Sequence, residues 1–210
     1  KRTGHEDADY ALRTVVLEMH ETAARYFEET LWGSNGADAR AYLDRRGVNE
    51  KLAGEFRLGF AERSGNPLTK QLRRFGEQAM EASGLCKKRD DGSFYDAFRG
   101  RLMFPIANES GKVIAFGGRA MYDGDEPKYL NSPGSPIYVK SNVLYSLHRA
   151  KDGHHARPLH AHRSATGTTD TDAPASRAEI RLLCAPFPGE RPHIARRYTR
   201  FCLLPLRGLR

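Results

Sequence analysis

The sequence predicts an α+β fold, in which short helices pack with a small antiparallel sheet and a tail without regular structure follows. Apolar residues first recur at helical spacing, the period changes to two after Gly84, and no regular period continues past Asp152. Helices that precede the strands of a small sheet are typical of α+β modules. We expect a linker at 1–9, a folded core at 10–152 and a basic tail of low order at 153–210.

The composition limits the class of protein. Of the 210 residues, 39% are hydrophobic, which is enough for a folded core. No window is apolar enough to cross a bilayer and no apolar signal segment opens the sequence, so we expect no membrane partner. The few cysteines make a reducing cytoplasm the expected location. The three cysteines, Cys86, Cys184 and Cys202, lack CxxC spacing, which argues against a disulfide framework and a structural zinc site.

A long helix is expected first, since apolar residues recur at helical spacing from Leu12 to Leu31. Asp7 or Asp9 is positioned to cap its start. Four short helices follow, each with a start or stop signal: 37–46 before Gly47, 50–56 after a capping Asn49, 67–75 from Pro67, and 76–84 closed by Gly84. Between them, residues 57–61 are expected to be extended and to enter the sheet.

The strands are expected after Gly84. The Asp-Asp-Gly at 90–92 is a turn signal, and RLMFPIANESGKVIAFGGRAM predicts two strands joined at 108–111. Residues 141–152 return to helical spacing.

The tail differs in composition from the rest of the chain. Residues 1–152 carry 24 Lys and Arg against 22 Asp and Glu, whereas 153–210 carry 10 Arg, no Lys and 4 acids. The tail is either a disordered basic extension or GC-rich DNA read in a shifted frame. The abrupt change at the end of a predicted helix favours the shifted frame, and reading the gene in its other two frames decides between them.

Familiar catalytic motifs are absent from the sequence. There is no phosphate-binding P-loop, dinucleotide fingerprint or HExxH motif. Asp123, Asp125 and Glu126 fall in a predicted turn, where a solvated loop is the better interpretation than a metal site. The tail histidines lack cysteine or acid partners, so we expect no metal to bind this chain.

Basic and aromatic residues on or beside the strands are the best candidates for function. Arg99 and Arg101 are two apart, so in an extended chain they point the same way. Arg119 follows Gly117 and Gly118, whose missing side chains permit close approach of a backbone or a ligand. The candidates that come next are Lys128, Tyr129, Asn131 and Lys140. Cations grip phosphates and rings stack on bases, so such a surface suits single-stranded nucleic acid. The alternative for each residue is an ion pair on a solvated face.

The motifs AYLDRRGV, FRLGFA, YDAFRGRLMFPIANESGKVIAFGGRAM, PKYLNSP and IYVKSNVLYSL occur in this order between Tyr10 and Asp152. Together they resemble the amino-terminal part of the catalytic core of bacterial DnaG-type DNA primases. The resemblance implies a nucleotidyltransferase, a DNA-directed RNA polymerase, that makes short RNA primers on single-stranded DNA template. It also implies nucleotides and the replicative helicase as partners at the replication fork.

The resemblance also implies roles for residues. Residues at the family's basic-groove positions are Arg46, Arg99, Arg101 and Arg119. Residues in the segment near the template and the incoming nucleotide are Lys128, Tyr129, Asn131 and Lys140. Mg²⁺ and zinc are cofactors of the intact family enzyme. They are held there by the carboxylates of a Toprim subdomain and by a zinc-binding domain.

This sequence departs from the family pattern in two places. The zinc-binding motif expected before residue 1 is missing, and GHHARPLHAH stands where an acidic Toprim signature is expected. We therefore expect a primase fragment that holds the template but makes no primers alone. A stand-alone single-strand-binding module without catalytic function is the alternative. A third interpretation, a helical domain whose basic residues only cap and pair, requires that the chain have no affinity for single strands.

Overall fold

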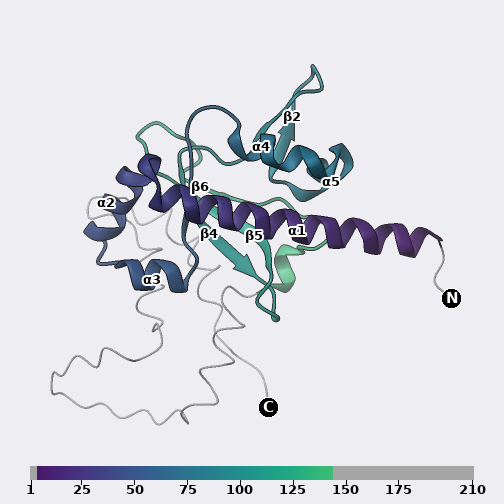
Figure 1. Cartoon of the computed structure of the whole chain (residues 1–210), viewed down its shortest axis with the longest axis horizontal. Coiled ribbons are helices and arrows are strands. Elements are labelled where there is room, and N and C mark those ends of the chain that lie inside the picture. The colour runs from purple at the N-terminus through teal and green to yellow at the C-terminus, as the bar shows by residue number, and fades with distance from the viewer. Residues whose placement is uncertain (1–3, 144–210) are drawn as a thin grey trace, which may run out of the picture. The chain divides into compact units, whose positions relative to one another are not determined.

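The computed structural model describes residues 4–143 and confirms the predicted combination of short helices with small antiparallel sheets (Figure 1). The helices are α1 (Gly4–Trp32), α2 (Ala37–Arg45), α3 (Glu50–Glu55), α4 (Pro67–Leu72) and α5 (Glu77–Ser83). Short 3-10 turns lie at Ser34–Gly36, Arg73–Phe75 and Lys140–Asn142. The strands are β1 (Gly59–Ala61), β2 (Cys86–Lys88), β3 (Phe94–Asp96), β4 (Arg101–Ala107), β5 (Val113–Ala120) and β6 (Tyr129–Asn131).

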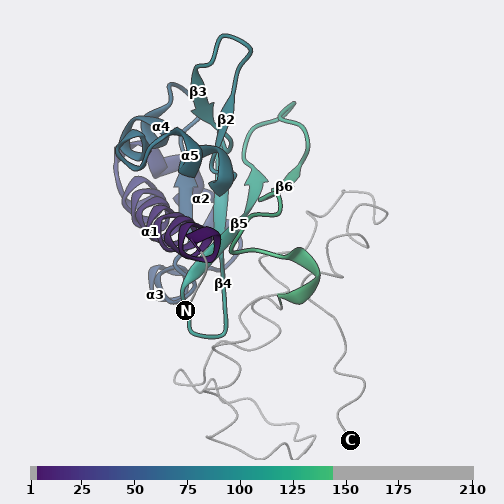
Figure 2. The same cartoon turned by 90° about the vertical axis from the view of Figure 1, so that its right-hand side faces the viewer.

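Four strands form the main sheet in the order β1-β4-β5-β6, with every neighbouring pair antiparallel. The predicted pair joined at 108–111 is its centre, strands β4 and β5. Strands β2 and β3 form a separate two-stranded ribbon, which projects at the top of Figure 2. Its turn contains the predicted Asp-Asp-Gly, and Gly92 has φ +80°, a conformation that glycine adopts without strain.

Helix α1 lies directly against one face of the sheet, and Gly59 is a point of close approach. A Cβ at Gly59 would lie 2.4 Å from the Phe27 Cβ, so no larger residue fits there. The strand register places Gly59, Met103, Gly118 and Leu130 on this face.

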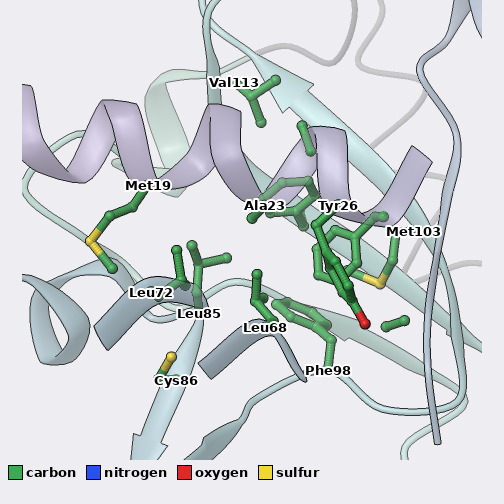
Figure 3. Packing of buried hydrophobic residues seen from close by; sticks show 14 of the residues in the cluster. Met19, Ala23, Tyr26, Leu68, Leu72, Leu85, Cys86, Phe98, Met103 and Val113 are labelled. Atoms are coloured by element: carbon green, nitrogen blue, oxygen red, sulfur yellow. The ribbon is translucent and has the colours of Figure 1, made fainter. Parts of the chain in front are cut away.

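The hydrophobic core extends from the sheet over α1 to the helices α4 and α5. In Figure 3, Leu68, Leu72 and Leu85 point toward Met19 and Ala23 of α1. All five side chains are at most 1% exposed. This packing explains why the apolar periodicity of α1 predicted a helix with one buried face.

The predicted helix ends agree with the structure except at the start of α1. The Asn49 carboxamide accepts a hydrogen bond from Leu52 N–H at 2.8 Å, as an N-cap does. Gly47 and Gly84 follow their helices with φ values of 71° and 69°. The expected cap at Asp7 or Asp9 is wrong, because the helix begins at Gly4 and both residues lie within it.

The Glu21 carboxylate connects α1 to the segment before β1 and to the start of β5. It accepts a hydrogen bond from Arg57 at 3.0 Å and one from the Val113 backbone N–H at 2.8 Å. Arg57 also donates to Glu28 at 2.8 Å, and its own backbone has φ +52°. The segment entering β1 and the β4–β5 hairpin are therefore both fastened to α1 by side chains.

Several expectations fall on residues that the structure does not describe. The helix expected at 141–152 lies almost entirely outside the described range, as do the tail, Cys184 and Cys202. Of the residues described, 4–143, none forms a helix long and apolar enough to cross a membrane.

His20 is a buried imidazole in the centre of the core. It is fully buried, its Nδ1 donates to the Val16 carbonyl at 2.8 Å, and its ring stacks on Phe116 with centroids 5.9 Å apart. Burial lowers the pKa of His20 to about 4. The folded protein therefore keeps this histidine neutral at pH values where the unfolded chain binds a proton.

We expect this histidine to make the protein acid-sensitive. Its pKa is depressed on folding, so stability is complete above pH 6.5 and is lost as pH falls toward 4. The loss at pH 5 is about 2 kcal/mol. Urea denaturation of the 210-residue chain at pH 7 and pH 5, beside His20→Leu, measures it. The variant should lose less stability than the wild type between these two pH values, and equal losses would contradict the expectation.

Candidate nucleic-acid interface

Two arginines and two tyrosines form a continuous stack between α2 and the sheet. The Arg46 Cζ lies 5.4 Å from the Tyr42 ring centroid, and the Arg119 Cζ lies 5.2 Å from the same ring. Arg119 is also 5.2 Å from the centroid of the Tyr129 ring and donates a hydrogen bond to the Tyr129 hydroxyl. We call these four residues, Arg46, Tyr42, Arg119 and Tyr129, the Arg–Tyr stack.

The stack explains how Arg119 can be buried. Its side chain is only 2% exposed, and a guanidinium removed from water is costly unless other groups compensate its charge. The electron-rich faces of Tyr42 and Tyr129 contribute to this compensation. Arg119 therefore fixes the position of Tyr129 rather than presenting its own charge to solvent.

The strand register determines which candidates share a surface. Arg119 pairs with Leu102 on one side and with Tyr129 on the other, so these side chains lie on the face opposite α1. Gly117 pairs with Asn131 on the same face, and the Asn131 carboxamide oxygen would lie 3.1 Å from a Cβ at Gly117. Asn131 thus occupies the space that the sequence analysis expected a ligand or another backbone to enter.

Arg101 lies on the other face of the sheet, so the expectation of a common surface with Arg119 is wrong. It pairs with Ala61 and Ala120, is 5% exposed, and donates to the Pro127 carbonyl at 2.7 Å. Burial lowers the pKa of the Arg101 guanidinium. Its methylene chain passes over Gly118, where a Cβ would lie 3.1 Å from the Arg101 Cδ.

Arg99 and Arg101 do not point the same way along one strand. Strand β4 begins at Arg101, and Gly100 before it has φ +59°, which breaks the alternation that the prediction assumed. Arg99 instead donates to the Asn66 carboxamide and lies 5.1 Å from the Tyr95 ring centroid. It belongs with the β2–β3 ribbon.

The remaining predicted residues lie at or after the edge strand β6. Tyr129 and Asn131 are within β6 and half-buried, and Lys128 precedes them, its carbonyl accepting from Ala120 N–H at 2.9 Å. Lys140 begins the last 3-10 turn and is exposed. The structure therefore gathers Arg46, Arg119, Tyr129 and Asn131, with Lys128 adjacent.

Tyr42 was missed by the sequence analysis. It lies four residues before Arg46, a spacing that places two side chains on the same face of a helix. That spacing could have revealed the pair. Tyr42 also contacts Arg119, which lies 77 positions later in the sequence. No local sequence pattern indicates a contact between residues so far apart.

The acidic loop before β6 is engaged with the protein's own cations. Asp125 pairs with Arg63 at 3.2 Å, and the Arg63 Cζ lies 4.8 Å from the Tyr122 ring centroid. Across the described range 4–143, no three His, Cys, Asp or Glu side chains are grouped so that they could hold a metal ion. We therefore assign no chemical step to the described residues.

The comparisons with known proteins agree on one family. Residues 26–151 match the family model "DNA primase catalytic core, N-terminal domain". The chain is 40% identical over 141 residues to a DNA primase of Halalkalibacterium halodurans, covering 65% of this chain and 23% of that protein. It is 41% identical over 146 residues to a DNA primase of a Synechocystis species, covering 67% and 23%.

Solved structures show the same relation. The DnaG primase catalytic domain bound to single-stranded DNA is 33% identical with a TM-score of 0.63, over 68% of this chain and 46% of that one. The RNA polymerase domain of Mycobacterium tuberculosis primase DnaG is 35% identical with a TM-score of 0.62, over 67% and 46%. The chain thus spans less than a quarter of the full-length relatives just named and less than half of these structures.

We expect Tyr42→Leu to destabilise the protein by about 1–2 kcal/mol, because it removes a ring from the buried Arg119 guanidinium while keeping an apolar side chain. Tyr42→Phe is the control, since it keeps the ring face, and it should cost less. Urea denaturation at pH 7 measures both. Equal stability of the leucine and phenylalanine variants would show that the ring does not compensate the Arg119 charge.

Proposed function

The chain belongs to the family of the DNA primase catalytic core, N-terminal domain, and from this premise we infer that its described part holds single-stranded DNA template for primer synthesis. The observation that carries the proposal is the Arg–Tyr stack. It fixes Tyr129 on the edge strand β6, next to Lys128 and Asn131. Tyr129 and Asn131 share one face of β6, and Lys128 comes directly before them in the chain. A ring and a carboxamide on an edge strand, with a cation at its start, suit a base and its phosphate.

The edge position of β6 supports this role. β6 ends the main sheet, so one of its sides has no strand partner in the sheet as described for residues 4–143. Tyr129, Leu130 and Asn131 are all half-buried, which leaves part of each side chain accessible. An extended single strand could therefore approach along β6, with Lys140 exposed beyond its end.

Primer synthesis itself belongs, in our proposal, to a larger protein. Nucleotidyl transfer needs metal ions that neutralise charge developing on phosphate oxygens. No three His, Cys, Asp or Glu side chains are grouped in the part of the chain that the structure describes, which supports placing Mg²⁺, zinc, nucleotide substrates and a replicative helicase with other parts of a primase. This chain would supply template binding.

A stand-alone module that binds single strands without catalytic function is the second candidate. The contacts of Tyr42 and Tyr129 with Arg119 support this module as well as they support a primase fragment. They stabilise a surface that could bind a strand, and they position no group for a reaction. The two candidates differ in the DNA that follows the codon for Asp152. A Toprim sequence in another frame supports the primase fragment, and its absence supports the module.

Template binding can be tested at the half-buried Lys128 and the exposed Lys140. Arg119 is unsuitable, because its replacement would disrupt the core around it. We expect Lys128→Gln with Lys140→Gln to weaken binding to a labelled single-stranded oligonucleotide. The salt dependence should become shallower by about 0.7 for each phosphate that the variant no longer neutralises. Fluorescence anisotropy at several salt concentrations measures both quantities.

Lys112→Gln is the matched control for that experiment. Lys112 is exposed and precedes β5, at the end of that strand away from Arg119. Its replacement removes one positive charge, as each substitution of the double variant does, and should leave the salt slope unchanged. An identical slope in the double variant and the wild type would remove Lys128 and Lys140 from the interface.

We also expect the purified 210-residue chain to make no primers. The expected result is no incorporation of labelled nucleotides on a single-stranded template with Mg²⁺ present, measured by gel electrophoresis of the products. A full-length bacterial primase is the positive control. Template-dependent dinucleotide formation by this chain would contradict the expectation.

A further inference from the structure

The two faces of the β2–β3 ribbon differ in how their cations are compensated. Lys87 pairs with Tyr95 across the strands and Lys88 pairs with Phe94, so these two pairs lie on opposite faces. The Lys88 ammonium lies 5.3 Å from the Phe94 ring centroid. The Arg89 Cζ lies 4.7 Å from the Tyr95 ring centroid, on the Lys87 face.

The Lys88 face is neutralised by α5. The Lys88 ammonium forms salt bridges with Glu81 at 2.7 Å and with Glu77 at 3.5 Å. These two carboxylates raise the pKa of Lys88 and leave its charge matched. An anionic partner would have to compete with them.

The Tyr95 face gathers several cations around one ring. Arg89 and Arg99 both lie within 5.1 Å of the Tyr95 ring centroid, so their guanidinium carbons are at most about 10 Å apart. Both guanidinium groups therefore lie against the same aromatic ring. Lys87 adds a third charge on the same face and is exposed, as is Arg89.

The described contacts of these cations are with neutral groups. Arg89 donates to the Ser93 hydroxyl at 3.2 Å, Arg99 donates to Asn66, and neither forms a salt bridge with any acid in the part of the chain that the structure describes. Hydrogen bonds with Ser93, and to a smaller extent the Arg89 charge, lower the pKa of Asp91 in the turn. The Asp91 carboxylate accepts from the Ser93 backbone N–H at 2.8 Å. The Arg99 Nε is buried without a hydrogen-bond partner among the described residues.

We propose that the Tyr95 face of the ribbon, formed by Lys87, Arg89, Tyr95 and Arg99, is a second contact surface for the phosphodiester backbone of single-stranded nucleic acid. The inference rests on the proposed function, because it identifies the partner as the same strand that β6 holds. Tyr95 holds two guanidinium groups beside one ring, so that one phosphodiester backbone can contact both of them. Guanidinium forks match the phosphate oxygens in geometry and charge.

The ribbon's position supports a surface separate from the Arg–Tyr stack. β2 and β3 are not hydrogen-bonded to the main sheet in the described range, and the ribbon projects away from β4 and β5 in Figures 1 and 2. A strand long enough to reach both surfaces should therefore bind more tightly than one that covers only one of them.

The test uses the full 210-residue chain and a labelled oligodeoxynucleotide of about 30 nucleotides, roughly twice the longest footprint of a single binding fold. We expect Lys87→Gln with Arg89→Gln to weaken binding roughly tenfold at low salt. The salt slope should become shallower by about 1.4, because two phosphates of a single strand are no longer neutralised. Lys88→Gln is the matched control on the opposite face, and its slope should equal that of the wild type.

Each result distinguishes this surface from the proposed function. An unchanged slope in the double variant overturns the ribbon proposal, while weaker binding by the Lys128 and Lys140 variants still supports template binding at β6. The reverse pattern overturns the β6 site and supports the ribbon. If a polyglutamate peptide binds as tightly as the oligonucleotide and responds equally to Lys87→Gln with Arg89→Gln, the partner is an acidic peptide and the proposal is wrong. Circular dichroism melting of each variant confirms that it is folded.

Discussion

The close approach of α1 to β1 at Gly59 is the constraint on which the other contacts depend. Because a Cβ there would lie 2.4 Å from the Phe27 Cβ, the helix can rest directly on the sheet only if this position is glycine. That contact assigns one face of the sheet to the core with α4 and α5. It leaves the other face for Arg119 and Tyr129, which α2 then covers through Tyr42.

Three arginines of this fold are held in three different environments. Arg57 is fixed by the carboxylates of α1, Arg101 by a backbone carbonyl, and Arg119 by two aromatic rings. All three act inside the protein. In our proposal, the cations that bind phosphate stand at the edge strand and on the ribbon. A basic residue near a strand is therefore not by itself a binding residue.

Much of the fold could be predicted from the sequence, because its signals are local. Helical periodicity, the cap at Asn49, the glycines that end α2 and α5, and the β4–β5 pair all depend on residues close together in the chain. The start of α1 could not be located from its acids, because Asp7 and Asp9 are also compatible with a first helical turn. The pairing of β1 with β4 and the separation of the ribbon depend on contacts between distant segments, which leave no periodic signal.

The candidate site was predicted in its residue types and only partly in its arrangement. Arg119, Tyr129 and Asn131 do lie together, but the alternation argument for Arg99 and Arg101 failed because Gly100 turns the backbone between them. The burial of the arginine side chains could not be predicted from the sequence either. A motif identifies an arginine, whereas its neighbours decide whether its charge faces solvent.

The link from Glu21 to the Val113 backbone N–H makes a side chain of the first helix part of the hairpin's hydrogen bonding. Since the same carboxylate also binds Arg57, opening any one of these segments breaks a bond belonging to another. Helix, strand entry and hairpin should therefore behave as a single cooperative opening unit in hydrogen exchange, with the Val113 amide reporting on the docking of a helix 92 positions earlier in the chain.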